Sequence, residues 1–216
     1  MRALLMLCAV AAPTLAHADD TFEAKAAGAE TITHLDDLVW LASETCERAN
    51  DVESRQCHHL QDARLAQLAG KSLIVRAGTF SVAEWSSAKK SAEITLAGCL
   101  ACGDGAIALD GKKFSVVASA PHNDGTVKPL YTTARPFESA AARDKLAAQA
   151  AVARVELVVK LGPAAGVGKA AWTVAGKPGI TLDVQAYRVV VPCDGSVLLA
   201  SPAATAVAPE PKACKH

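Results

Sequence analysis

The sequence has few aromatic residues and no net charge, and these two shortages exclude several classes of protein. Phe, Trp and Tyr together make up 4% of the 216 residues, which argues against a surface that stacks the bases of single-stranded nucleic acid. The 22 basic side chains are balanced by 22 acidic ones, so the chain has no bulk electrostatic attraction for nucleic acid. We therefore expect no nucleic acid partner.

The sequence also lacks recognisable catalytic and cofactor motifs. It contains no nucleophile elbow and no paired carboxylate motif, and Cys102 is followed by Gly103 where a c-type haem signature requires histidine. Residues 162–169 read GPAAGVGK, but their spacing differs from that of a phosphate-binding loop, and Ala170 stands where that loop needs a hydroxyl. We therefore expect no cofactor and favour a protein that is not an enzyme.

The N-terminus has the layout of an export signal. Arg2 is followed by an apolar run over residues 3–16, and residues 16–18 read AHA, a small-x-small cleavage site. The run is shorter than the roughly 20 apolar residues that span a membrane. We expect residues 1–18 to be a signal peptide, the mature chain to have no transmembrane segment, and the protein to be secreted or periplasmic.

The cysteine count agrees with export. Of the seven cysteines, Cys8 lies in the predicted signal peptide, which leaves six. An even number of cysteines in an exported chain is typical of disulfides formed in an oxidising compartment. The candidates are Cys46, Cys57, Cys99, Cys102, Cys193 and Cys214.

Residues 33–70 predict a helical hairpin that follows a loose lead-in over residues 19–32. Apolar residues recur at helical spacing from Leu35 onward, and a second capping signal begins at Asn50. On one continuous helix Cys46 and Cys57 would lie about 16 Å apart, too far for a disulfide. A turn near Asn50 would bring them together, so this is the first pairing that we favour. Metal binding by Cys57 and the two histidines after it is the alternative, but adjacent histidines on a helix point in different directions.

Residues 71–200 predict a β-rich region. Apolar alternation over residues 73–82 and the following stretch at residues 91–98 are typical of strands, and Asp110-Gly111 predicts a tight hairpin turn. Residues 120–136 suggest a long loop, because they contain three prolines, and the next segment suggests a helix that Pro136 would begin.

Two Val-rich strands follow, at residues 154–162 and 180–192. The expected fold class is α+β, with a mostly antiparallel sheet of five or six strands and one helix between strands. This order is compatible with an OB-like barrel and equally with an open sheet. We expect residues 33–200 to form a single domain.

Residues 201–216 predict an extended tail rich in alanine and proline. Cys214 lies two residues from its end and would tether it. Cys193 is one candidate partner for Cys214; Cys99, Cys102 or a cysteine of another chain are the others.

The stretch AGCLACGDG contains Cys99 and Cys102 in a Cys-x-x-Cys spacing with three possible roles. A structural disulfide is favoured by the oxidising compartment. Thiol exchange would be expected if the pair began a helix, but glycines follow it. A zinc site would need Cys193 and a fourth ligand, and the chain has no second Cys-x-x-Cys.

The sequence thus favours an exported, disulfide-stabilised domain with a binding or structural role, whose partner would be a protein or a small molecule. A periplasmic thiol-disulfide exchange protein that uses Cys99 and Cys102 is the first alternative, and a zinc-binding module the second. A binding face would be marked by exposed aromatic side chains near loops, for which the candidates are Trp85, Tyr131 and Trp172.

Overall fold

The computed structural model describes residues 20–43, 46, 50–68, 70–119, 121–161 and 170–210. The predicted signal peptide and Cys214 lie outside these residues. Within them the chain has a mixed α+β fold with four α-helices and three main sheets, none of which closes into a barrel. No helix in this part of the chain combines the length and the apolar character needed to cross a membrane.

The first sheet contains the most deeply buried strand among the described residues. Its strands in spatial order are β1 (Glu30–Ile32), β2 (Leu73–Val75), β9 (Arg154–Lys160), β12 (Asp183–Val190) and β13 (Val197–Ser201). Within this sheet, only β1 and β2 pair in parallel, and the other neighbouring strands are antiparallel. All five residues from 155 to 159 on β9 are buried, so both faces of this strand are covered.

The second sheet carries the candidate site. It comprises β10 (Ala171–Val174), β11 (Lys177–Thr181), β7 (Lys112–Val117) and β5 (Cys99–Ala101), with β6 (Ile107–Leu109) paired to β7 as well. Strands β6 and β7 form the hairpin that the sequence predicts. Asp110 and Gly111 have φ values of 47° and 73°, the left-handed backbone that such a tight turn requires.

The third sheet is small and lies beside a helix. It consists of β3 (Phe80–Val82), β4 (Ser91–Leu96) and β8 (Tyr131–Pro136). Ser139 is the N-cap of helix α4 (Ala140–Val152), and its hydroxyl accepts a hydrogen bond from Ala142 N at 3.2 Å. The helix therefore starts after Pro136, which ends a strand that the sequence had suggested to be part of a loop.

The expected single sheet with a possible OB-like barrel is wrong. Strands β2 and β3, which follow each other in the sequence, belong to different sheets, and Gly78 between them has a φ of +119°. The first sheet stays open because β1 and β13 are its two edge strands. A large cluster of buried side chains nevertheless includes residues of all three sheets, such as Leu73, Ile94 and Val116.

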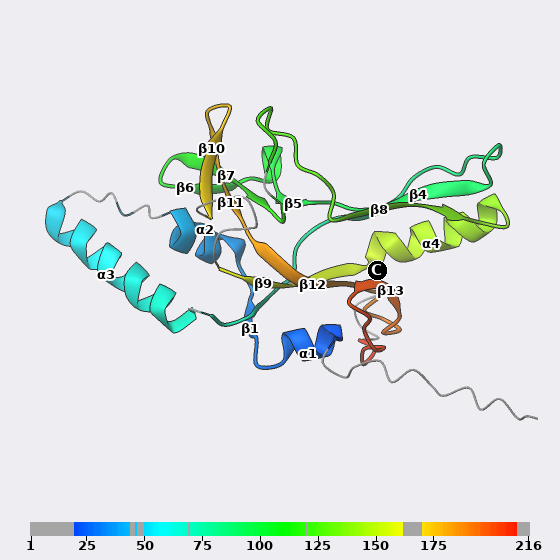
Figure 1. Cartoon of the computed structure of the whole chain (residues 1–216), viewed down its shortest axis with the longest axis horizontal. Coiled ribbons are helices and arrows are strands. Elements are labelled where there is room, and N and C mark those ends of the chain that lie inside the picture. The colour runs from blue at the N-terminus through cyan, green and yellow to red at the C-terminus, as the bar shows by residue number, and fades with distance from the viewer. Residues whose placement is uncertain are drawn as a thin grey trace, which may run out of the picture.

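Helices α2 (Leu35–Ser43) and α3 (Asp51–Leu68) do not support the expected packed hairpin. Figure 1 shows α3 projecting away from the sheets, at the end of the molecule opposite α4. A disulfide from Cys46, which follows α2, to Cys57 joins α3 to the segment after α2, and Gln61 Nε2 on α3 donates a hydrogen bond to Trp40 O on α2 at 2.6 Å. Helix α3 is largely polar, and its buried residues are Cys57, Gln61 and Leu68, so it lacks the apolar stripe that packing against α2 would need.

Three arginines surround Glu156 on β9, and we refer to these four residues as the arginine cluster. Glu156 is 3% exposed. Its carboxylate pairs with Arg76 Nε at 3.2 Å, Arg154 Nε at 3.1 Å and Arg188 Nη2 at 2.7 Å. A buried carboxylate is stable only where such partners compensate for its lost hydration.

The arginine cluster also holds both ends of the described chain. Arg188 pairs with Glu23 at 3.3 Å, and Arg154 pairs with Glu210 at 3.0 Å. The segment predicted as a loose lead-in thus includes α1 (Phe22–Ala26), whose Phe22 is buried. Residues 203–210 have no regular structure, and an ion pair from Glu210 to Arg154 attaches this segment to the sheet.

Candidate functional site

The two Cys pairs of known geometry differ in burial. Cys46 and Cys57 are 2% and 8% exposed, with alpha carbons 5.6 Å apart, and form the pairing that the sequence favours. Cys99 and Cys102 are bonded to each other with alpha carbons 6.0 Å apart, and both are only half-buried. The second disulfide is therefore the less buried of the two.

The two remaining candidate cysteines are Cys193, which is described, and Cys214, which is not. Cys193 is disulfide-bonded, and Cys214, one of the partners considered for it, lies outside the described residues. Since Cys99, Cys102 and Cys193 all belong to disulfides, none of them offers a thiolate for zinc. Over the described part of the chain, no group of three or more His, Cys, Asp or Glu side chains is arranged to hold a metal ion. The described residues therefore give no support to the hypothesis of a zinc site that contains Cys99, Cys102 and Cys193.

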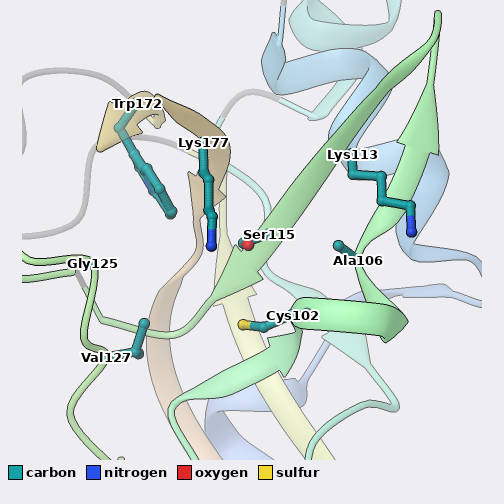
Figure 2. A pocket seen from close by; sticks show the side chains of 9 residues that line it. Cys102, Ala106, Lys113, Ser115, Gly125, Val127, Trp172 and Lys177 are labelled. Atoms are coloured by element: carbon teal, nitrogen blue, oxygen red, sulfur yellow. The ribbon is translucent and has the colours of Figure 1, made fainter. Parts of the chain in front are cut away.

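Cys102 lines a cavity of about 350 Å³ on the second sheet. Figure 2 shows its sulfur on one side of the cavity, with side chains from several separate segments around it. The described lining residues are Cys102, Gly103, Ala106, Lys113, Ser115, Gly125, Val127, Trp172 and Lys177.

Strand pairing explains why two lysines face this cavity. On β7, Lys113 and Ser115 share one face because side chains alternate along a strand. Strand β11 runs parallel to β7 with Gly179 opposite Ser115, so Lys177 occupies the matching position two residues earlier. In Figure 2 the Lys177 side chain extends toward Ser115. The pairing of β7 with β11 thus places two ammonium groups on one sheet face.

Trp172 forms a wall of the cavity above a glycine. Trp172 on β10 pairs with Gly179 on β11, and its indole Nε1 donates a hydrogen bond to Thr181 Oγ1 at 2.9 Å. A methyl group added at Gly179 would lie 2.2 Å from Cζ2 of the indole. The absence of a side chain at Gly179 therefore allows the indole to lie flat along the strand.

The cysteine side of the cavity is formed by an irregular strand end. Strand β5 pairs with β7 through Cys99 opposite Val117, and the register shifts before Ala101. Cys102 Sγ then lies 4.0 Å from Val116 O. Cys99 is not among the described residues that line the cavity, so the two sulfurs of this disulfide are not equivalent.

The loop that supplies Gly125 and Val127 is held by its own hydrogen bonds. The Asp124 carboxylate accepts hydrogen bonds from Thr126 N at 2.9 Å and Thr126 Oγ1 at 2.7 Å, and these bonds lower the pKa of Asp124. Where the loop passes β5, a methyl group added at Gly98 would lie 1.9 Å from Lys128 O. This close backbone approach fixes Val127 at the rim.

The charge of the cavity is positive. Among the described residues that line it there is no Asp, Glu or His. Lys113 and Lys177 take part in no ion pair among the described residues, whereas every arginine of the arginine cluster does. Among the described lining residues, Ser115 has no histidine beside it that could act as a base.

Most of the cavity could not be recognised in the sequence. Of the three aromatic candidates, Trp172 lines this cavity, whereas Tyr131 lies at a different hollow beside β13 and Trp85 is half-buried between β3 and β4. Lys113, Ser115 and Lys177 were missed because they become neighbours only through the pairing of β7 with β11. Lys112 and Lys113, which follow Asp110-Gly111, were a signal in the sequence. Because side chains alternate along a strand, one of these two lysines had to lie on the same face as Ser115.

Comparison of the chain with protein-family models, with curated proteins and with solved structures finds no match. The functional argument therefore depends on the chemistry of the cavity and of the two disulfides.

Proposed function

We propose that the protein is an exported, disulfide-stabilised binding protein without catalytic activity, and that its cavity binds a small organic anion. The observation that carries the proposal is the pair Lys113 and Lys177, which face one hollow beside an indole with no carboxylate among its described lining residues.

The lining matches a ligand that has one charged and one apolar end. A carboxylate, sulfonate or phosphate would interact with the two ammonium groups and the Ser115 hydroxyl. A ring or short carbon chain would contact Trp172 and Val127. The volume of about 350 Å³ is within the usual range for small-molecule sites.

Export is the second element of the proposal. It is supported by the signal-like residues 1–18 and by disulfides, which persist in oxidising compartments. The test is expression of the full chain in a Gram-negative host, followed by the intact mass of the protein in the periplasmic fraction. We expect the mass of a chain that begins at Asp19; a full-length protein in the cytoplasm would refute export.

The ligand site can be tested with 8-anilinonaphthalene-1-sulfonate, a fluorescent anion with an aromatic part. We expect saturable binding to the wild type, weakened about tenfold in the double variant Lys113→Met, Lys177→Met, because two charge-assisted contacts are lost. Lys112→Met is the matched control, since Lys112 lies on the same strand but on its other face and does not line the cavity.

Equal affinities of the wild type and the double variant would contradict the proposal, because they would place the probe elsewhere. A loss of affinity in Lys112→Met as large as that in the double variant would contradict it too, since the effect would then come from net charge.

A further inference from the structure

The Cys99–Cys102 disulfide differs from the buried Cys46–Cys57 disulfide in one chemical respect: one of its sulfurs faces the anion cavity. Cys102 lines the cavity and Cys99 does not. A disulfide sulfur that a ligand can reach is an electrophile, because a thiolate can attack it and displace the other sulfur. The lysine-lined cavity would therefore bring an anionic ligand directly to a reactive group.

We propose that the ligands of this cavity are small thiols that carry a carboxylate or sulfonate, and that they are captured covalently on Cys102. This inference rests on the anion binding proposed above and names the ligand class for the same site.

The reaction is a disulfide exchange with no net oxidation. The ligand thiolate attacks Cys102 Sγ, a new sulfur–sulfur bond forms between ligand and Cys102, and the bond from Cys102 to Cys99 breaks. Cys99 leaves as a thiolate that takes a proton from water. Release is the reverse step, in which the Cys99 thiolate attacks Cys102 Sγ and displaces the ligand thiolate.

The position of the sulfurs determines which of them is attacked. Attack on a disulfide proceeds in line with the breaking bond, and the rate depends on access to the sulfur concerned. From the cavity only Cys102 is reached, so the ligand becomes attached to Cys102 and Cys99 is released. This is the reverse of the order in thioredoxin-like pairs, in which the first cysteine is the accessible one.

The two lysines give the exchange its charge preference. Lys113 and Lys177 raise the local concentration of anionic thiolates and repel cationic ones. A lysine near Cys102 also favours its thiolate when both cysteines are reduced. Neutral thiols gain nothing from either effect.

The backbone around the disulfide can keep both cysteines in place after the bond opens. Cys99 is held in β5 by its pairing with Val117. Cys102 O accepts a hydrogen bond from Gly105 N at 3.0 Å, in the short 3-10 turn Gly103–Gly105. Capture of a ligand therefore does not require the sheet to unfold, and Cys99 stays close enough to reverse it.

The test compares three small thiols that differ in charge: 2-mercaptoethanesulfonate, 2-mercaptoethanol and 2-mercaptoethylamine. Each is mixed with the oxidised wild-type protein, the reaction is stopped with acid, free thiols are blocked with N-ethylmaleimide, and peptides are analysed by mass. We expect the sulfonate on Cys102 and the maleimide on Cys99. Per thiolate, the sulfonate should react about tenfold faster than the neutral thiol, and the amine slowest.

The same measurement on Lys113→Met, Lys177→Met should remove the charge preference, while Lys112→Met should keep it. Two further variants separate the sulfurs. In Cys99→Ala, Cys102 is the thiol of this pair that remains, and it should react readily with the symmetrical disulfide of 2-mercaptoethanesulfonate. In Cys102→Ala the remaining thiol is Cys99, which should react about tenfold more slowly, because access differs. Both variants lose the same disulfide, so a loss of stability affects them alike.

The outcomes separate this inference from the proposed function. Attachment to Cys99, or equal rates for Cys99→Ala and Cys102→Ala, would overturn the inference while binding of the fluorescent anion still held. Earlier opening of Cys46–Cys57 than of Cys99–Cys102 would overturn it as well. If the wild-type protein neither binds the fluorescent anion nor prefers the anionic thiol, the proposed function is overturned together with the inference.

Discussion

The arginine cluster and the cavity both gather positive side chains, but they differ in what the charges face. Around Glu156, three guanidiniums share a buried carboxylate, and two of them are also paired with Glu23 and Glu210. At the cavity, Lys113 and Lys177 have no such partner among the described residues and face a hollow. Paired charges hold strands and chain ends together, whereas unpaired charges at a hollow are available to a ligand.

The two disulfides differ in the same way: one is buried in the structure and the other lies at the cavity. Cys46–Cys57 is buried and joins α3 to the segment after α2, which is a structural task. Cys99–Cys102 spans three residues and exposes one sulfur to the cavity. A short link at the proposed ligand site constrains little chain and is available for the proposed exchange.

The largest expected effect is on the arginine cluster. Replacing Glu156 with Gln leaves three guanidiniums without their shared buried charge, which should lower the free energy of unfolding by about 3–5 kcal/mol. Urea-induced unfolding followed by circular dichroism measures it. Glu93→Gln is the control, because Glu93 is an exposed glutamate on β4 and its replacement should change little. A loss no greater than that of the control would mean that the cluster is not structural.

The next prediction compares the disulfides. Replacing Cys46 and Cys57 with Ala should lower the free energy of unfolding by about 3 kcal/mol, and replacing Cys99 and Cys102 by about half as much, because the second link closes a shorter loop. Thermal and urea unfolding of the two double variants give the comparison. A greater loss of stability on replacing Cys99 and Cys102 would contradict this prediction, because it would give the larger structural role to that disulfide and not to Cys46–Cys57.

A smaller effect is expected at the cavity wall. Gly179→Ala places a methyl group against the Trp172 indole, so the indole must move and its bond to Thr181 is lost. Overpacking of this kind costs about 1–3 kcal/mol, and binding of the fluorescent anion should weaken. Gly105→Ala has no atom within 4 Å of the added methyl group and serves as the control. Unchanged binding in Gly179→Ala would exclude Trp172 from the ligand site.

The smallest effect concerns pH and the end of the described chain. Hydrogen bonding from Arg154, together with its charge, lowers the pKa of Glu210 from the ordinary value of 4.5. Because the folded-state pKa is the lower one, the contact is fully present above the ordinary value and is lost as pH falls through the lowered pKa. Amide hydrogen exchange at Val207, which is bonded to Gly195 O at 3.0 Å, should accelerate in that range after correction for intrinsic rates. The variant Glu210→Gln should lack this pH dependence, and its persistence there would point to another group.

The regular parts of the fold were predictable, because their signals are local. Alternation identified β4, the Asp110-Gly111 turn identified the β6–β7 hairpin, and a run of helix-forming residues identified α4. Strand β8 was missed because most of its residues are exposed or half-exposed and polar, so it has no apolar alternation. The second sheet depends on the parallel pairing of β7 with β11, which joins segments far apart in the sequence, and periodicity carries no information about partners.

The candidate site was predictable in its cysteines and not in its lysines. The Cys-x-x-Cys spacing drew attention to Cys99 and Cys102, and the structure joins them. Which of the two sulfurs faces a hollow depends on the register shift in β5, and a shift of one residue is invisible in the sequence.

The contrast between paired and unpaired charges can be tested directly by locating a bound anion. A titration of the ¹⁵N-labelled protein with 8-anilinonaphthalene-1-sulfonate, followed by two-dimensional NMR, reports which amides sense the ligand. We predict shifts at Lys113, Ser115 and Lys177 and at the indole N–H of Trp172, with the amides of the arginine cluster unchanged. Shifts centred on the arginine cluster, with the cavity silent, would contradict the account.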